Sequence, residues 1–136
     1  MAIKIVTDST CDLPEDLIEK HGITVVPLYI NFGEKGFLDG IEISLQEFYE
    51  ITEIGQIQPV TATPGLEAFT NTYRHLAEEG ADEILSIHIS HSLSATINVA
   101  RAAAEDVDFS VTVLDSGQLS LGEGFMVLEA ARLASE

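Results

Sequence analysis

The sequence predicts an α/β fold of three layers, with helices on both faces of a largely parallel sheet. Short runs rich in β-branched residues alternate along the chain with segments of helical spacing, and turn or capping residues separate them. Alternation at this interval is typical of βαβ units, which place parallel strands in one sheet. At 136 residues and 46% apolar composition, the chain is long enough to bury the core of one domain.

Four segments have the composition of buried strands and run into polar residues. They are 3–7 (IKIVT), 23–31 (ITVVPLYIN), 83–89 (EILSIHI) and 111–115 (VTVLD). Pro27 lies within the second segment and has no amide proton for a sheet ladder, so this segment is either an edge strand or interrupted. Residues 32–43 fit neither pattern, and we expect a loop or a short extra strand there.

Five helices are predicted from their ends and their apolar spacing. Asp12 can cap the first helix, which ends before Gly22. Ser44 and Glu47 form a predicted capping box for the second helix. The third, fourth and fifth helices are expected to begin near Thr63, Ser94 and Gly122.

The charge of the chain excludes some classes of partner. Six Lys and Arg against 23 Asp and Glu give a net charge of −17, which repels nucleic acid and anionic membrane surfaces. No apolar run reaches the roughly 18 residues that a membrane span needs, and no secretory leader is recognisable. The single cysteine, Cys11, has no partner for an intramolecular disulfide. We expect a soluble cytoplasmic protein, with Cys11 as a quiet small residue.

Hydroxyl and carboxyl side chains follow three of the predicted strands, and Thr61 and Thr63 precede the third helix. Ligands bind beyond the carboxyl ends of parallel strands, where helix N-termini add amide donors. We therefore expect all four clusters on one edge of the sheet, which would suit a small anionic group. Such residues also cap helices, and capping is the favoured role for Asp8, Asp12, Thr63 and Ser116 taken singly. The post-strand clusters are Thr7, Asp8, Ser9 and Thr10, then Ser90, His91, Ser92 and Ser94, then Asp115 and Ser116.

Catalytic alternatives have weaker signals in the sequence. Serine, histidine and aspartate are available for a triad, but no GxSxG elbow is present. His88 or His91 could carry a phosphoryl group. The four histidines lack the spacing of metal ligands, and no Walker or GxGxxG motif occurs, so no metal or cofactor is expected.

Four segments, taken together and in this order, resemble the DegV family of bacterial fatty-acid-binding proteins. They match its opening TDS segment, its TSQPS-type loop, its S-x-x-LSGT signature and its closing IDS segment. The resemblance covers the whole chain. It implies that residues 1–136 form a single α/β lobe like the N-terminal domain of the family, with the C-terminal lobe of the lipid pocket absent. The four segments are 6–14 (VTDSTCDLP), 59–64 (PVTATP), 89–96 (ISHSLSAT) and 113–124 (VLDSGQLSLGEG).

By this resemblance the protein is a carrier and not an enzyme. Family members hold a long-chain fatty acid and present its carboxylate to a separate kinase subunit, which makes an acyl phosphate for phospholipid synthesis. The resemblance implies that Thr61 and Ser94 hydrogen-bond the carboxylate, since a hydroxyl donates without burying a second charge. The supporting polar rim would comprise Asp8, Ser9, Thr63, Ser90, Ser92, Asp115 and Ser116.

The chain departs from the family pattern at two places in these segments. Ala62 stands where the loop usually has serine, and Ala95 replaces the glycine of LSGT. An isolated lobe would also expose apolar surface and self-associate. Two other functions stay open: a phosphotransfer or hydrolase domain that uses Ser94 or His91, and an interaction module that keeps the fold without lipid.

Overall fold

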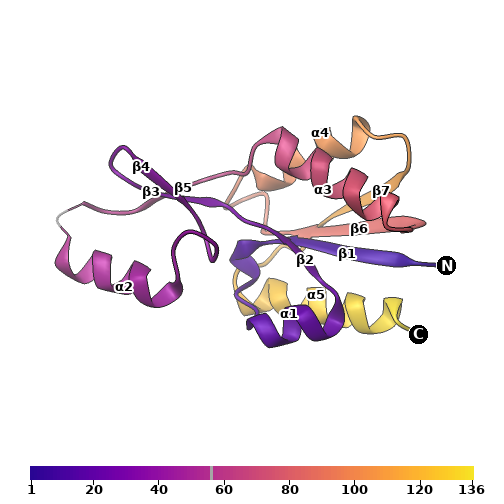
Figure 1. The fold of residues 1–136 in the computed structure, drawn as a ribbon, viewed down its shortest axis with the longest axis horizontal. Coiled ribbons are helices and arrows are strands. Elements are labelled where there is room, and N and C mark those ends of the chain that lie inside the picture. Colours follow the sequence, from indigo (N-terminus) through magenta and orange to yellow (C-terminus); the bar gives the residue numbers. More distant parts are fainter. Residues whose placement is uncertain (56) are drawn as a thin grey trace.

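The protein contains two sheets that lie side by side (Figure 1). The computed structural model describes residues 1–55 and 57–136. Four parallel strands form the larger sheet in the order β2-β1-β6-β7, and three antiparallel strands form the smaller one in the order β4-β3-β5. The larger sheet comprises β1 (Ile3–Asp8), β2 (Thr24–Val26), β6 (Glu83–His88) and β7 (Ser110–Asp115). The smaller comprises β3 (Tyr29–Phe32), β4 (Lys35–Leu38) and β5 (Val60–Ala62).

Helices cover both faces of the larger sheet, which confirms the predicted three-layer α/β fold. Figure 1 shows α3 and α4 on one face and α1 and α5 on the other. The helix α2 lies apart from them, beside the smaller sheet. The bounds are α1 Glu15–His21, α2 Leu45–Ile54, α3 Leu66–Glu78, α4 Thr96–Glu105 and α5 Leu121–Ala134, and a short 3-10 helix, η1, spans Ser9–Cys11.

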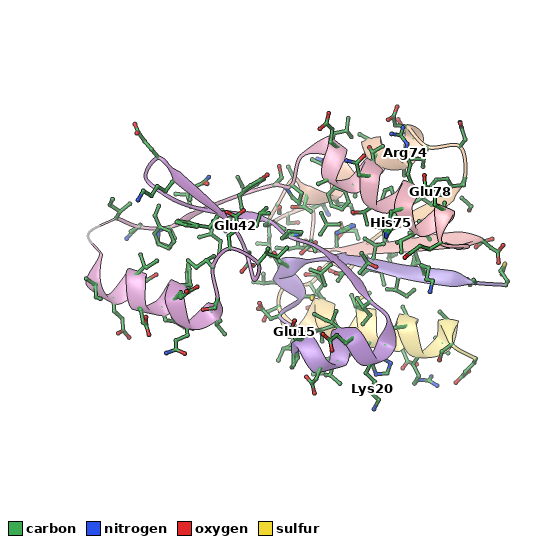
Figure 2. All side chains as sticks on the ribbon, in the orientation of Figure 1. Glu15, Lys20, Glu42, Arg74, His75 and Glu78 are labelled. Atoms are coloured by element: carbon green, nitrogen blue, oxygen red, sulfur yellow. The ribbon has the colours of Figure 1, made fainter. Side chains whose placement is uncertain are left out.

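The core forms on both faces of the larger sheet because successive residues of a strand point to opposite sides. Val6 of β1 packs with Phe69 and Tyr73 of α3 on one face. Its neighbour Ile5 packs with Val127 of α5 on the other. Arg74 on α3 and Lys20 on α1 point away from the sheet, on the outer sides of their helices (Figure 2).

The predicted strand 23–31 is two strands in two different sheets. β2 ends at Val26, and β3 begins at Tyr29 in the smaller sheet. Pro27 lies between them and offers no amide proton, so the ladder of the larger sheet stops there. Both predicted alternatives therefore hold, since the segment is interrupted at Pro27 and β2 lies at the edge of the larger sheet, whereas one continuous strand over 23–31 is wrong. Residues 32–43 contain the short extra strand β4.

One predicted cap and one helix start were misplaced. Asp12 has a left-handed φ of 53° and ends η1, while α1 begins after Pro14. The N-cap of α3 is Gly65, so Thr63 lies before this helix and does not cap it. The helix α4 begins at Thr96, near Ser94 as predicted, and the Ser94 Oγ accepts the amide proton of Thr96. A residue before proline prefers extended backbone, which delays the start of α3 beyond Pro64. The capping box of Ser44 and Glu47 is confirmed.

Gly124 provides a test of how closely α5 packs against η1. A Cβ at this position would lie 2.6 Å from the carbonyl oxygen of Cys11 and 2.9 Å from Cδ2 of Leu13. Gly124→Ala should therefore lower the free energy of unfolding by about 1–3 kcal/mol, measured by urea denaturation.

The matched control is Gly122→Ala in the same helix. There the new Cβ would meet only the Gln118 side chain, which is exposed and can move aside. Because alanine favours helix by about 1 kcal/mol over glycine, this variant should be as stable as the unchanged protein or more stable. Equal effects of the two substitutions would contradict close packing at Gly124.

Candidate functional site

The carboxyl ends of β1, β6 and β7 lie side by side at one edge of the larger sheet, and this edge points toward the smaller sheet (Figure 1). The structure brings together the polar clusters that follow these strands. His88 of β6 is in register with Asp115 of β7. The backbone amide of His91 donates to Asp115 Oδ2 over 3.3 Å, and that of Ser90 donates to the carbonyl of Gln118 over 2.9 Å. The loops after β6 and β7 are thus tied to each other.

The fourth predicted cluster belongs to the smaller sheet. Thr61 lies on β5, where it is in register with Ile30 of β3, and its side chain is exposed. Thr63 follows β5 and is half-buried. The expectation that all four clusters share one edge of one sheet is therefore wrong for Thr61 and Thr63. The physical reason is the break at Pro27, after which the chain builds a second sheet.

Several hydroxyls of the predicted rim form hydrogen bonds that connect segments or close turns. The Oγ of Ser9 accepts the amide proton of Leu28 over 3.0 Å, which fastens the end of β1 to the segment that leads into the smaller sheet. Burial raises the pKa of Asp39, and a hydrogen bond from Ser9 partly offsets this rise. Ser116 accepts from the amide of Gln118 over 3.1 Å and so closes a turn. The Oγ of Ser90 accepts from the amide of Ser92 over 3.2 Å, whereas the side chain of Ser92 is exposed.

Ser94 differs from these residues because its hydroxyl proton has no acceptor among the described residues. Its Oγ lies 2.8 Å from Thr96 Oγ1 and accepts the amide proton of Thr96 over 3.1 Å. Thr96 is fully buried, and among the described residues Ser94 Oγ is the only partner of its hydroxyl. A buried hydroxyl proton needs an acceptor, so Thr96 donates to Ser94. The half-buried Ser94 hydroxyl therefore accepts two hydrogen bonds and keeps one proton to donate outward.

A chain of fully buried polar side chains runs beneath this edge. The Tyr73 hydroxyl donates to Ser86 Oγ over 2.8 Å, and Ser86 Oγ lies 2.6 Å from His88 Nε2. His88 Nδ1 lies 2.9 Å from Asp8 Oδ2, which also accepts the amide proton of Ile89 over 3.2 Å. Burial raises the pKa of Asp8, but the hydrogen bond and charge of His88 outweigh it, so this pKa stays below its ordinary value.

Ser86, His88 and Asp8 occur in the contact order of a hydrolytic triad, yet the arrangement lacks access. All three side chains have no exposed surface, and the serine oxygen already accepts from Tyr73. A nucleophile must reach its substrate, so these residues serve the core rather than catalysis. The sequence analysis missed Ser86. Its position two residues before His88 on one strand face was the available signal.

Glu123, on the first turn of α5, is a second residue that the sequence analysis did not single out. It is fully buried, and its carboxyl contacts the hydroxyls of Thr7 over 3.1 Å and Thr10 over 2.7 Å. Burial, followed by the charge of Asp8, raises the pKa of Glu123 to about 8. The sequence showed only a polar residue between two glycines, at a place where helices commonly carry an acid.

The thiol of Cys11 is unreactive in this setting. Burial raises its pKa to about 12, so it stays protonated at neutral pH, as the interpretation of a quiet residue requires. In the described part of the chain, no group of three or more His, Cys, Asp or Glu side chains is placed to hold a metal ion. None of the helices described there is long and apolar enough to cross a bilayer.

Comparison with known proteins gives one consistent result. The family model described as uncharacterised proteins of the DegV family matches residues 2–136. A DegV domain-containing protein of Clostridium perfringens is 42% identical over 132 residues, which are 96% of this chain and 47% of the relative. One of Streptomyces coelicolor is 41% identical and also matches over 47% of its length. The chain thus spans about half the length of the curated relatives it matches.

Solved structures agree with this family match. A DegV family protein from Thermus thermophilus, described by its fatty acid binding, has a TM-score of 0.88 and 44% identity over 99% of this chain and 48% of that protein. DegV of Bacillus subtilis, a fatty acid binding protein, has a TM-score of 0.94 and 34% identity over 99% and 48%. A stearic acid-binding protein from Eubacterium ventriosum has a TM-score of 0.89 and 31% identity over 98% and 47%.

Replacing Asp8 by asparagine tests whether the buried network stabilises the fold. Asp8 Oδ1 accepts from the amide of Thr10 and Oδ2 from the amide of Ile89, so an NH₂ group in place of either oxygen would face a donor. Asp8→Asn should therefore lower the free energy of unfolding by about 2–4 kcal/mol in urea denaturation.

Asp12→Asn is the matched control. Asp12 is exposed, and asparagine tolerates its left-handed φ of 53°. We expect a change within about 0.5 kcal/mol. If the two variants lose the same stability, Asp8 is not the centre of the network.

Proposed function

This chain belongs to the DegV family, and on that premise we propose that it forms one wall of a fatty-acid site, with Ser94 and Thr61 donating to the ligand carboxylate. The observation that carries the proposal is the contact of Ser94 Oγ with both the backbone amide and the hydroxyl of Thr96. Two donors from Thr96 hold the Ser94 oxygen and leave its hydroxyl hydrogen for an acceptor. A hydrogen bond to a charged acceptor contributes about 1.5–3 kcal/mol, which is enough to fix the head group.

Neutral donors suit a carboxylate ligand in a molecule of this charge. The net charge of −17 repels an anion at long range, so binding depends on short-range donors and apolar contact. Ser94 precedes α4 by one residue, Ala95, so it lies beside the N-terminus of that helix, where the helix dipole adds partial positive charge. Thr61 offers an exposed hydroxyl from β5.

One exposed leucine adjoins Ser94 in the chain, and another follows Thr61 by five residues. Leu93 precedes Ser94 and is 61% exposed, and Leu66 at the start of α3 is 46% exposed. We propose that they contact the acyl tail, of which each buried methylene contributes about 0.8 kcal/mol. Because the chain spans about half the length of its relatives, we propose that residues outside these 136 supply the rest of the pocket.

In the full proposal the protein is a cytoplasmic carrier and not an enzyme. It corresponds to the N-terminal lobe of the family and presents a fatty-acid carboxylate to a kinase subunit, which forms an acyl phosphate for phospholipid synthesis. Among the described residues no base contacts Ser94, which supports hydrogen bonding rather than nucleophilic attack. Self-association of this lobe stays a prediction. We expect it at the apolar groove of about 410 Å³ between β7 and α5, where Leu114, Phe125 and Leu133 are exposed.

One observation favours a phosphotransfer alternative. His91 is exposed, and its Nδ1 lies 2.5 Å from Asp115 Oδ2, which orients the ring and leaves Nε2 to solvent. Treatment with acetyl phosphate followed by intact mass spectrometry separates the two functions. A phosphoryl adduct that is lost in His91→Gln would favour phosphotransfer, whereas fatty acid in a solvent extract of the native protein favours the carrier. An interaction module would give neither.

Alanine substitutions at the hydroxyls test the proposed head-group contacts. Ser94→Ala should weaken binding of oleate about tenfold or more, and Thr61→Ala should weaken it by a smaller factor because Thr61 is more exposed. Isothermal titration calorimetry on this chain, and on any longer reading frame that contains it, measures both.

Ser92→Ala is the control from the same loop. Ser92 is exposed, and its side chain has no hydrogen-bond partner among the described residues. Its oleate affinity should change less than about twofold. If Ser94→Ala and Thr61→Ala bind oleate as well as Ser92→Ala, the proposed carboxylate site is wrong.

A further inference from the structure

One hydroxyl group stands between two buried carboxyl groups in this protein. Thr10 Oγ1 lies 2.7 Å from Glu123 Oε2 and also contacts Asp8 Oδ1 within hydrogen-bonding distance. Glu123 and Asp8 have no exposed surface. The three residues come from α5, β1 and η1, so the contact joins elements far apart in the chain.

Counting protons assigns a charge state to each carboxyl group. The Thr10 hydroxyl has one proton and can donate to only one carboxylate. Asp8 receives further donors from His88 Nδ1 and from the amides of Ile89 and Thr10. Within residues 1–55 and 57–136, Glu123 receives only the Thr7 hydroxyl besides this contact. Asp8 is therefore the ionised group. Thr10 donates to Asp8, and Glu123 carries a proton on Oε2 that it donates to Thr10.

The groups around Glu123 agree with this assignment. Asp8 faces it from β1 and Cys11 from η1, with Asp12 just beyond, and His88 of β6 is reached only through Asp8. The nearby charges are thus negative, apart from a histidine that is already engaged. Burial and the charge of Asp8 raise the pKa of Glu123 to about 8, while the thiol of Cys11, with a pKa of about 12, stays neutral over the same range.

Hydrogen bonds connect this cluster to the loop that carries Ser94. Asp8 Oδ2 holds the amide of Ile89 over 3.2 Å. The next residue, Ser90, accepts at its carbonyl the amide protons of Leu93 over 3.0 Å and Ser94 over 3.2 Å. The position of the Ser94 backbone therefore depends on where Asp8 holds the end of β6.

We propose that neutral Glu123 is a positioning residue for the fatty-acid site, and that loss of its proton weakens fatty-acid binding at Ser94. Once the proton has left to solvent, two carboxylates compete for the single proton of Thr10. The repulsion between them displaces Asp8 and, through Ile89, the loop from Ser90 to Ser94. The inference rests on the proposed function and extends it to the control of that site.

The direction of the pH dependence follows from the raised pKa. The folded protein keeps the Glu123 proton up to about pH 8, whereas in the unfolded chain it is lost near the ordinary value of 4.5. The contribution of this group to stability is therefore complete below about pH 4.5 and is lost as the pH rises through about 8. Binding should weaken over the upper part of the same interval.

Oleate affinity as a function of pH, in the unchanged chain and in Glu123→Gln, tests the proposal. Glutamine stays neutral at every pH and keeps a donor toward Thr10. Between pH 7 and 9.5 the unchanged chain should lose affinity at least about threefold more than Glu123→Gln, since one ionisation has passed its midpoint. Titration of oleate itself affects both proteins equally and cancels in this comparison. Equal pH profiles would overturn the proposal.

Carbon-13 NMR of the Glu123 carboxyl group in the ligand-free chain gives a readout that is independent of binding. We expect the signal of a protonated carboxyl at pH 6.5 and a titration midpoint near 8. An ionised Glu123 at pH 6.5 would overturn the proposal even if Glu123→Gln failed to fold. A chain that binds no oleate at any pH would overturn the proposed function and, with it, the effect of Glu123 on binding. The carboxyl signal would still show whether Glu123 is protonated, so the two failures can be distinguished.

Discussion

The buried carboxylate of Asp8 is the interaction on which the rest of this structure depends. It sits at the carboxyl end of β1 without exposed surface, and a buried charge is stable only when donors satisfy it. Those donors come from His88 and Ile89 at the end of β6 and from Thr10 in η1. Two strands and the following turn are thereby fixed around one group, and α5 joins through Glu123.

The edge of the larger sheet thus has hydrogen-bonded buried side chains beneath it and a hydroxyl with a proton to donate at its surface. Below, each buried polar side chain of the described residues has a hydrogen-bond partner. At the surface, the Ser94 hydroxyl accepts from Thr96 and keeps its own proton for another acceptor. A site for a small anion needs a donor of this kind, because donors whose protons are already in hydrogen bonds cannot bind the ligand. The neutrality of these donors also avoids the cost of burying a second charge beside Asp8.

The smaller sheet carries Thr61, the second proposed donor, on β5. Pro27 ends the ladder of the larger sheet, and the chain continues into β3, β4 and β5. Ser9 then anchors the segment between β2 and β3 by accepting from Leu28. This joint places the sheet that carries Thr61 opposite the edge that carries Ser94 (Figure 1). Ser9, which directly follows Asp8, thus connects the buried network to the segment that leads into the smaller sheet, and so to the positions of both proposed donors.

The sequence by itself determined the α/β class, the main strands, the capping box of Ser44 and the DegV family, because periodicity, capping and motif spacing are local properties of the chain. It also indicated that the residues after β1, β6 and β7 gather at one edge, since parallel strands end together. Only the tertiary structure decided that Thr61 lies in a second sheet and that the side chains of Ser86, His88 and Asp8 form one buried series of hydrogen bonds. It alone also decided that Glu123 shares a hydroxyl with Asp8. These contacts join residues up to 113 positions apart, and no local pattern encodes a hydrogen bond across such a separation.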